Sequence, residues 1–404
     1  LDELDRFKDK KGLVGENARY INRYLDDLRK EGSLHKGIKI NNGQTIKVAL
    51  SGFNQVPVGL DPDYADNKMI SLALHLQEKY DRRVVLITKD INFRVKCDSL
   101  GIISEDYYKD NIVLENAEAF KGFFDITTDD PDIISRLYNY CNGDDALEAF
   151  IDLCKEKIGR KPYANEYFCV KSGSASFIGR WEQEKIEKVA TPKDFCEEFQ
   201  RLSVSPRNRE QLYAFNSLLD TSLPMVTISG LAGSGKTFIA LMSAYALVQA
   251  GYYDRIVFTR NITPVGRDIG FLPGTADDKM SPWLAPIMDN FRIGLKDTNL
   301  SLFSTLKEQG IIEVSPLSFI RGRTFNNSIL IMDEAQNATI HELKTVITRM
   351  GENSKIILLG DVDQIDTPYI DTLSNGLTIV SEKFKNEDCA SHIALKRGER
   401  SYLS

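Results

Sequence analysis

The chain has 404 residues, of which 42% are hydrophobic and 27% are charged, and its formal net charge is −7. This length favours two or more domains, each with its own core. The acidic balance excludes a globally basic nucleic-acid-binding surface, so any nucleic-acid contact must be local. No segment approaches the roughly 20 apolar residues of a membrane span. The six cysteines form no C-x-x-C pair. We therefore expect a cytoplasmic protein that does not enter a membrane.

Residues 1 to about 125 alternate between helix and strand patterns. Glu16–Lys30 has apolar residues at helical spacing, and Asp66–Tyr80 is a second amphipathic helix. Arg83–Thr88 is an apolar run typical of a buried strand. The alternation predicts a small α/β domain with a parallel sheet.

Residues 126 to about 203 are interpreted as a connector. Thr127–Tyr140 and Asp144–Lys157 are expected to be helices, and Tyr167–Val170 with Ser176–Ile178 are expected to form a β-hairpin. The connector either orients the flanking domains or lines an RNA channel, and the sequence leaves both alternatives open.

Residues 204–404 are predicted to form a second α/β domain. Its expected strands are the apolar runs Met225–Ser229, Ile256–Thr259, Ile329–Met332 and Lys355–Leu359. The segment from Gly266 to Pro286 has little periodicity, and it is either a nucleic-acid-contacting or subunit-bridging loop, or an ordered surface excursion.

A phosphate-binding loop follows the first of these strands. Residues 230–237 fit the pattern G-x-x-x-x-G-K-[ST], and an apolar helix pattern begins at Phe238. A strand, a glycine-rich turn and a helix N-terminus direct backbone N–H groups at a phosphate. Lys236 is expected to reach the β- and γ-phosphates, and Thr237 to hold Mg²⁺. The predicted nucleotide-binding residues of this loop are Gly230, Leu231, Ala232, Gly233, Ser234, Gly235, Lys236, Thr237 and Phe238.

Two carboxylates follow the strand pattern of residues 329–332. Asp333 and Glu334 are expected at the carboxyl end of a central strand, which is where open α/β sheets bind ligands. Asp333 is predicted to hold Mg²⁺, and Glu334 to orient or polarise the attacking water. An acidic pair after a strand is often only a cap or turn, but the upstream phosphate loop favours the catalytic reading.

Other polar residues are candidates for the same nucleotide site. Gln364 follows the strand pattern of residues 355–359 and is predicted to sense the γ-phosphate, unless it belongs to a simple turn. Gln211 and Asn208 lie at a helix start, and Gln211 has the paired donor and acceptor that can read an adenine edge. The chain has no N-K-x-D motif for guanine, so ATP is favoured over GTP.

Two arginines are candidates for transition-state stabilisation. Arg400 is favoured for contact with the γ-phosphate, because a guanidinium there offsets the charge that develops during transfer. Arg349 is a second candidate, acting within the chain or across a subunit interface. A solvated surface arginine is the alternative for each.

Three acids in the first domain lie at expected helix or strand ends. Glu3 and Asp66 begin helices, and Asp90 follows the strand pattern of residues 83–88. Such acids are often helix caps. If the three converge, they need a divalent cation to offset their repulsion, and Mg²⁺ or Mn²⁺ held there would activate water against a phosphodiester. Arg94 and Lys96 either contact phosphates or lie on a solvated helix face, and Asp98 is read as a supporting or solvated residue.

Residues 204–404 resemble the PhoH ATPase family, which is related to superfamily-one helicases. The resemblance rests on the phosphate loop and on further stretches: Thr259-Arg260, Asp268 to Gly274, Ile320 to Arg323, Asp333 to Asn337, Gln364 to Asp366, Ser374 to Leu377, and Gly398 to Ser401. It implies a P-loop NTPase fold with a RecA-like parallel sheet, ATP hydrolysis with Mg²⁺, assembly into a homo-oligomeric ring, a hexamer, and a link to RNA.

Residues 1–125 resemble PIN domains of the kind fused to PhoH ATPases. The matching stretches are Glu3 to Lys8, Asp66-Asn67, Val84 to Asp90, and Arg94 to Lys96. The resemblance implies a three-layer α/β nuclease domain in which Glu3, Asp66 and Asp90 are the catalytic, metal-binding carboxylates. PIN domains carry a further Asp on a first strand, and this chain begins beyond the expected place of that strand.

Together these features predict an ATP-dependent RNA helicase or translocase joined to a metal-dependent endoribonuclease that acts on single-stranded RNA. The alternative is an ATP-gated RNA-binding scaffold or motor whose PIN module is inert. A kinase-like phosphotransferase is disfavoured, because no acceptor pocket is evident in the sequence.

Overall fold

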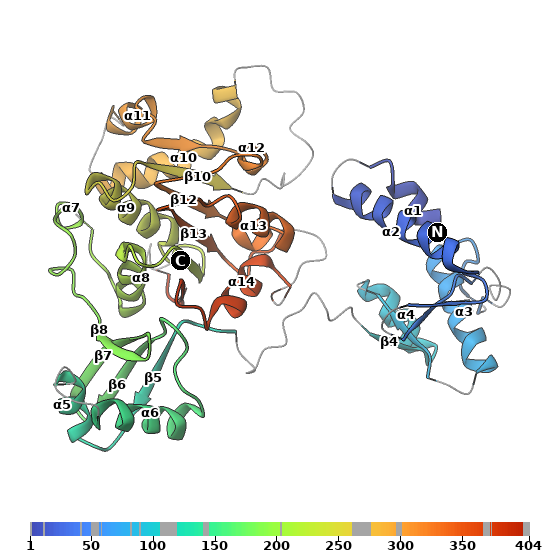
Figure 1. Ribbon diagram of the computed structural model, residues 1–404, viewed down its shortest axis with the longest axis horizontal. Coiled ribbons are helices and arrows are strands. Elements are labelled where there is room, and N and C mark those ends of the chain that lie inside the picture. Colours follow the sequence, from blue (N-terminus) through green and yellow to red (C-terminus); the bar gives the residue numbers. More distant parts are fainter. Residues whose placement is uncertain are drawn as a thin grey trace. The chain divides into compact units, whose positions relative to one another are not determined.

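The computed structural model divides the chain into two compact units, Leu1–Tyr107 and Tyr108–Ser404 (Figure 1). It describes residues 2–398 except 11–12, 41–42, 50–55, 58, 81–82, 89, 106–118, 140–144, 203, 261–275, 296–300, 367–371 and 373. The two units are taken separately below. The finer division of the sequence at residues 125 and 203 stays a prediction.

The first unit combines helices with short strands. Its elements are α1 (Asp2–Phe7), α2 (Leu13–Glu31), β1 (Ile38–Lys39), β2 (Thr45–Ile46), α3 (Ala65–Lys79), β3 (Val85–Ile87), α4 (Ile91–Ser99) and β4 (Ile103–Glu105). β3 and β4 pair in parallel, as the alternation of patterns predicts. A small core forms between α3 and α4, where Ile70 and Ala73 pack with Phe93 and Cys97.

The prediction of a buried strand at Arg83–Thr88 needs correction. The strand is only Val85–Ile87, and the side chain of Ile87 is 60% exposed. Within the part of the chain that the structure describes, β3 pairs with β4 alone. A central strand needs neighbours on both edges and cover on both faces, and β3 has neither among these residues.

The second unit is organised by a six-stranded parallel sheet in the order β11-β10-β12-β13-β9-β14. The strands are β9 (Met225–Gly230), β10 (Arg255–Arg260), β11 (Ile312–Val314), β12 (Ser328–Asp333), β13 (Lys355–Gly360) and β14 (Ala390–Leu395). The four strands expected from the sequence are confirmed. The edge strands β11 and β14 were not predicted, because β11 is short and β14 is interrupted by polar residues.

Alternate residues of each central strand enter separate cores on the two faces of this sheet. In β12, Ile329 and Ile331 belong to one core, and Leu330 and Met332 belong to the other. Burial on both faces explains why these strands read as continuous apolar runs.

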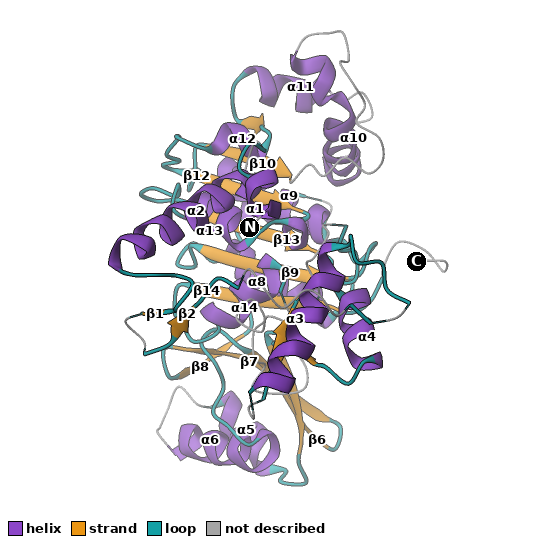
Figure 2. Ribbon diagram, turned by 90° about the vertical axis from the view of Figure 1, so that its right-hand side faces the viewer, coloured by secondary structure: helices purple, strands orange, loops and turns teal. Residues whose placement is uncertain are grey.

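Helices cover both faces of the large sheet (Figures 1 and 2). One core is closed by α7 (Glu197–Gln200), α8 (Arg209–Leu219), α9 (Lys236–Gln249), α10 (Ala276–Leu295) and α11 (Ser301–Glu308). The other is closed by α12 (Leu317–Ile320), α13 (Ile340–Ile347) and α14 (Gly376–Phe384). The segment Gly266–Pro286 is therefore not wholly a loop, because α10 begins at Ala276; residues 266–275 lie outside the described residues.

A smaller four-stranded sheet, β5-β6-β7-β8, precedes the large sheet in the chain. Its elements are β5 (Phe123–Thr127), α5 (Asp132–Tyr138), α6 (Asp145–Ile158), β6 (Tyr167–Ser172), β7 (Ala175–Glu182) and β8 (Lys185–Lys188). The predicted hairpin is confirmed, with Gly173 at φ 56° in its turn. The predicted helix Thr127–Tyr140 is shorter than expected, because Thr127 ends β5.

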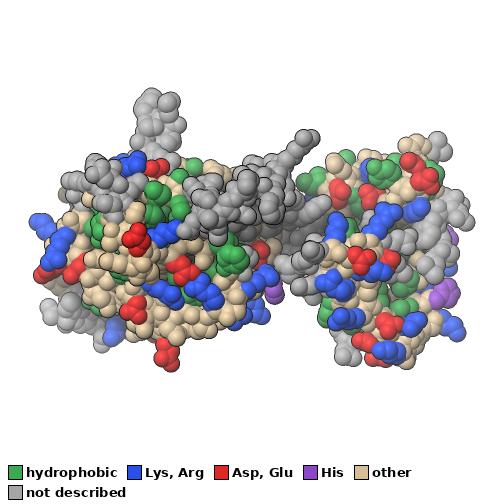
Figure 3. Space-filling view, turned by 90° about the horizontal axis from the view of Figure 1, so that it is seen from above, with side chains coloured by type: hydrophobic (Ala, Val, Ile, Leu, Met, Phe, Trp, Pro, Cys, Tyr) green, Lys and Arg blue, Asp and Glu red, His purple; other side chains and the backbone are tan. Residues whose placement is uncertain are grey.

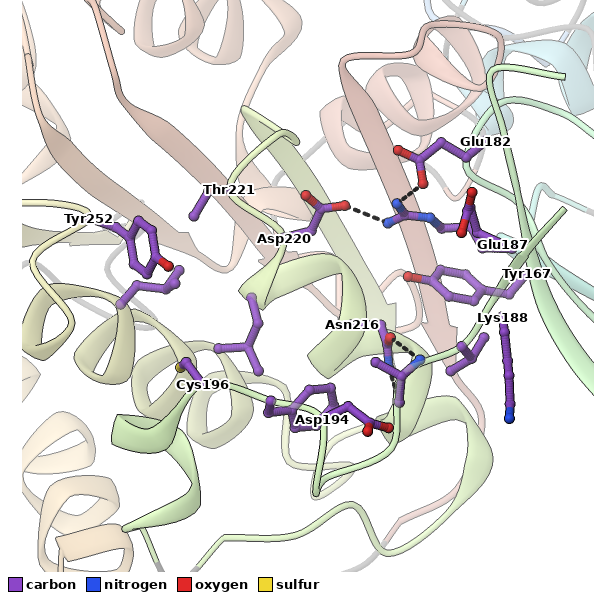
Figure 4. Close-up of a pocket in the computed structure, with 16 residues that line it drawn as sticks. Tyr167, Glu182, Glu187, Lys188, Asp194, Cys196, Asn216, Asp220, Thr221 and Tyr252 are labelled. Atoms are coloured by element: carbon purple, nitrogen blue, oxygen red, sulfur yellow. Dashed lines mark hydrogen bonds and ion pairs between the residues drawn. The ribbon is translucent and has the colours of Figure 1, made fainter. Parts of the chain in front are cut away.

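Buried polar contacts join the smaller sheet to the helices of the large one, as Figure 4 shows. Arg180 on β7 forms ion pairs with Glu182 and, at 2.7 Å, with Asp220 after α8. The hydroxyl of Tyr167 lies 2.9 Å from that of Ser217, and its ring stacks on Tyr213 with centroids 4.6 Å apart. The smaller sheet is therefore packed against α8, and the described residues of the connector belong to the second unit.

Histidine 392 links β14 to β9, the strand before the phosphate loop. Its Nδ1 lies 2.8 Å from the hydroxyl of Thr227, and burial lowers the pKa of His392 to about 4. Between about pH 6.5 and 4, His392 is protonated in the unfolded chain but stays neutral in the folded chain. The free energy of unfolding therefore falls as pH falls. The expected loss is about 3 kcal/mol over this window.

We predict that His392→Gln removes this dependence. Urea unfolding of the second unit, followed from pH 7 to pH 4, measures the slope. His341→Gln, at an exposed position on α13, is the matched control and should keep the wild-type slope. An unchanged slope in His392→Gln would show that other groups cause the acid sensitivity.

The described surface mixes both signs of charge. On the face drawn in Figure 3, Lys and Arg side chains alternate with Asp and Glu side chains. This fits the expectation that any nucleic-acid contact is local. Among the described helices, none combines the length and apolar character needed to cross a membrane.

Candidate active site

The phosphate loop connects β9 to α9 at the carboxyl edge of the large sheet. Gly230, Gly233 and Gly235 have φ values of 155°, 80° and 90°. These positive values favour glycine, because a Cβ atom is strained there. At Gly230 a Cβ would also lie 2.4 Å from the carbonyl oxygen of Leu395. The three motif glycines are thus required by the path of the backbone.

Lysine 236 lies over this loop. Its Nζ donates to the carbonyl oxygens of Gly230 and Leu231 at 2.5 and 2.9 Å. Lys236 is also the first residue of α9, and the free backbone N–H groups at the start of this helix favour a bound anion. Charge and backbone dipoles therefore converge where the sequence predicts bound phosphates.

The two predicted magnesium ligands of this site are neighbours. The hydroxyl of Thr237 donates to Asp333 Oδ2 at 3.3 Å, although the two residues are 96 positions apart. Burial raises the pKa of Asp333, and the adjacent Glu334 raises it further, whereas Arg260 and Lys236 act in the opposite direction. A partly buried carboxylate and a hydroxyl are oxygen donors that suit Mg²⁺, and a cation there would offset the cost of ionising Asp333.

Glutamate 334 is held by contacts on both carboxylate oxygens. Oε1 accepts from Arg260 Nη2 at 2.6 Å, and Oε2 accepts from Gln336 Nε2 at 2.7 Å. Its backbone is left-handed, with φ 55° and ψ 37°, and its N–H donates to Asp333 Oδ1. A non-glycine residue in this conformation is uncommon and marks a position fixed by its surroundings.

Glutamine 336 connects the ends of two strands. Its Nε2 also donates to the Gln364 carbonyl oxygen at 2.9 Å, and its Oε1 accepts from the Asp361 N–H at 3.1 Å. The predicted sensor Gln364 is thereby tied to the residue that contacts Glu334. Gln336 itself is fully buried.

Residues of the phosphate loop, of α9 and α10, and of the ends of β10, β12 and β13 line a cavity of about 1050 Å³. The cavity lies at the carboxyl ends of β9, β10, β12 and β13, where parallel sheets bind ligands. It brings together the predicted residues Lys236, Thr237, Asp333, Glu334 and Gln364. Its size suits a nucleotide.

Sequence reasoning missed part of the cavity wall. Asp289, Asn290, Arg292 and Ile293 of α10 line it, as does Arg260 at the end of β10. The α10 residues reach the site only by tertiary packing, and no sequence motif marks them. Arg260 had a usable signal, because it ends an apolar strand beside the strand that carries Asp333.

The predicted adenine contact of Gln211 needs qualification. Gln211 is buried; its Oε1 accepts from the Arg207 N–H at 2.8 Å, and its Nε2 donates to the Ser234 carbonyl oxygen at 3.1 Å. Both halves of the amide are thus engaged with the protein. Asn208 caps α8 by accepting from the Gln211 N–H. These contacts brace the phosphate loop. Gln211 also lines the cavity described above, and its amide keeps a second N–H and a second lone pair, so the adenine contact stays a prediction.

Both arginines predicted to stabilise transferred charge remain without support at this site. Arg400 lies outside the described residues. Arg349 precedes Met350 at the end of the α13 segment, and its backbone bonds to Phe325, away from the residues that line the cavity.

Of the carboxylate cluster predicted in the first unit, the structure describes the side chains of Asp66 and Asp90, and the cluster itself stays a prediction. Asp90 is exposed and caps α4, with Oδ1 accepting from the Phe93 N–H at 3.1 Å. Asp66 lies in the first turn of α3; burial raises the pKa of the Cys97 thiol, and the charge of Asp66 adds to this effect. Glu3 lies in α1, and its side chain is outside the described part. No group of three potential metal ligands occurs among the described side chains.

The basic residues near Asp90 have local partners. Arg94 donates to the Thr88 carbonyl oxygen at 3.3 Å, and Lys96 lies over the Tyr64 ring at 5.9 Å. Neither contact prevents the charged group from meeting a phosphate, so the predicted RNA contact stays a prediction.

Comparisons with known proteins bear on both units. The family described as "PhoH-like protein" matches residues 203–400, and the "PIN domain" family matches residues 1–108. "Protein PhoH2" of Bacillus subtilis (strain 168) is 36% identical, with 100% of this chain and 91% of that protein aligned. This chain belongs to the PhoH2 family.

Two further PhoH2 proteins have similar coverage. Those of Thermobispora bispora and Mycolicibacterium smegmatis are 31% and 30% identical, and each alignment covers 97% of this chain and 85% of the relative. The two family matches show that this chain joins a PIN domain to a PhoH domain. The α/β fold class expected from the sequence is confirmed.

Proposed function

We propose that this chain is an ATP-dependent RNA helicase or translocase coupled to a PIN endoribonuclease that cuts single-stranded RNA. The observation that carries the proposal is the convergence of Lys236, Thr237, Asp333 and Glu334 on one cavity at the carboxyl edge of the large sheet. Such an edge is where α/β proteins bind and hydrolyse nucleotides.

Each residue has a defined task in ATP hydrolysis. Lys236 and the α9 amides bind the phosphates, and Thr237 with Asp333 would hold Mg²⁺, which neutralises phosphate charge when bound. Glu334 accepts a hydrogen bond from the attacking water and orients it. Gln364 senses the γ-phosphate. Its carbonyl oxygen accepts a hydrogen bond from Gln336, so a shift of Gln364 would be felt at the residue that contacts Glu334.

A ring of identical subunits, a hexamer, is part of the proposal, as is cytoplasmic location. The ring supplies neighbouring subunits that can act in turn on one RNA strand. Both come from the family resemblance, and native mass spectrometry with ATP tests the ring.

A nuclease role for the PIN unit gives a sharp prediction at Asp90. We expect Asp90→Asn to cut single-stranded RNA at least roughly 100-fold more slowly, because a metal-binding carboxylate is lost. Asparagine caps a helix as well as aspartate does, so α4 is preserved. The measurement is cleavage of end-labelled RNA with Mg²⁺ or Mn²⁺.

Asp98→Asn is the matched control, since Asp98 is an exposed acid on the same helix. It should cut as the wild type does. Equal cutting by Asp90→Asn and the wild type would remove Asp90 from the nuclease site.

One observation favours the alternative, an ATP-gated RNA-binding scaffold or motor with an inert PIN module. Asp90 acts as a helix cap, because its carboxylate accepts from the Phe93 N–H at the start of α4. RNA-stimulated ATP hydrolysis by a wild-type protein that never cuts RNA, with either metal, would select this alternative.

A further inference from the structure

The contact between Arg260 and Glu334 is the feature of the nucleotide site that the proposed chemistry does not use. Arg260 is the last residue of β10 and lies opposite Asp333 in the register of β10 and β12. Its guanidinium reaches past that neighbour to Glu334 Oε1, at 2.6 Å. We call this ion pair the Arg260 clasp.

The clasp leaves Glu334 unsuited to activating water. To orient water, Glu334 must turn one oxygen toward it, and the hydrogen bonds from Arg260 and Gln336, one to each oxygen, hold the carboxylate in a fixed orientation. The contact therefore opposes the role that Glu334 has in hydrolysis.

Of the two partners, Arg260 is the one that can leave. Gln336 is fully buried and is fixed by Asp361 and Gln364, so moving it disturbs two strand ends. Arg260 lines the cavity, and its side chain is 37% exposed. A phosphate oxygen entering the cavity offers the guanidinium a competing anion.

We propose that Arg260 is a positioning residue that restrains Glu334 in the resting protein and releases it to a phosphate. The inference rests on the proposed ATP hydrolysis. The phosphate comes either from the nucleotide or from the RNA backbone. In either case ATP turnover is slow while the clasp is closed, and Glu334 becomes free to receive water when it opens.

The test is steady-state ATP hydrolysis at ATP concentrations well below KM, where the rate includes the cost of opening the clasp whichever phosphate opens it, by wild type, Arg260→Gln and Arg260→Ala, with and without single-stranded RNA. Without RNA, both variants should turn over roughly two- to fivefold faster than wild type, the range expected for losing a partly exposed ion pair. A structural role alone would lower turnover, because damage to the site does not speed a reaction.

Arg323→Gln is the matched control. Arg323 pairs with Glu313 beside the same sheet, and the two side chains are 35% and 26% exposed, against 37% and 27% for the clasp. Its loss should leave turnover unchanged, which separates the effect of the clasp from that of losing any arginine.

The RNA arm identifies the phosphate. If RNA opens the clasp, RNA stimulates wild type but adds nothing to the variants; if the nucleotide opens it, the factor of stimulation is the same in all three. RNA-free turnover in both variants at or below the wild-type rate overturns the inference. Absence of hydrolysis by wild type is a different result, which overturns the proposed function itself.

Discussion

Lys236→Ala is expected to lower ATP hydrolysis by roughly 10²- to 10³-fold, the usual cost of removing one preorganised group that stabilises transferred charge. Lys236 is the cation directly over the phosphate loop, with Nζ 2.5 and 2.9 Å from two of its carbonyl oxygens. No other lysine lines the cavity among the described residues, so none can replace it. Phosphate release from ATP, measured with and without RNA, gives the effect.

The matched control for this change is Lys344→Ala, at an exposed position on α13. It removes the same side chain away from the cavity and should hydrolyse ATP at the wild-type rate. Thermal unfolding of both variants checks that the domain is folded. Hydrolysis by Lys236→Ala near the wild-type rate would place the nucleotide elsewhere.

Glu334→Gln is expected to separate binding from hydrolysis. The substitution keeps the size of the side chain and removes the carboxylate that accepts from water, so kcat should fall roughly 10²- to 10⁴-fold. ATP affinity should stay close to that of the wild type, because Lys236, Thr237 and the loop amides are intact. Single-turnover hydrolysis and binding of a fluorescent ATP analogue measure the two effects.

This prediction has an internal contrast with the Arg260 clasp. Glu334→Gln and Arg260→Gln break the same ion pair, yet the first should slow turnover and the second should speed it. Glu308→Gln, an exposed acid on α11, serves as the control and should do neither. Equal turnover by Glu334→Gln and the wild type would show that Glu334 does not orient the attacking water.

The nucleotide site was largely predictable because its residues follow strands in the sequence. The phosphate loop follows β9, the acids Asp333 and Glu334 follow β12, and Gln364 comes shortly after β13. Parallel strands place these ends at one edge of the sheet, so strand patterns alone bring distant residues together. The 3.3 Å contact of Thr237 with Asp333 is the structural counterpart of that reasoning.

The remaining features depend on contacts that leave no periodic signal. The side chain of Gln211 has a paired donor and acceptor, but only the fold shows that it also bonds to the backbone of Arg207 and Ser234. The wall formed by α10 follows from how that helix packs on α9. The clasp depends on the side-chain direction of Arg260, which strand pattern does not specify.

The first unit was harder to predict for a different reason. Its acids lie at helix starts, and Asp90 satisfies the Phe93 N–H as an ordinary cap does. Capping and metal binding use the same residue type at the same place, so sequence position cannot separate them. Substitution of Asp90 by asparagine separates them, because only the charge is lost.

The most direct test of the account is ATP-dependent strand release from an RNA duplex with a single-stranded tail. Wild type and Lys236→Ala are compared with Mg²⁺, with and without ATP. We expect the wild type to release the labelled strand only with ATP, and Lys236→Ala to release none. Equal release by the two proteins would contradict the assignment of an ATP-driven RNA motor to this chain.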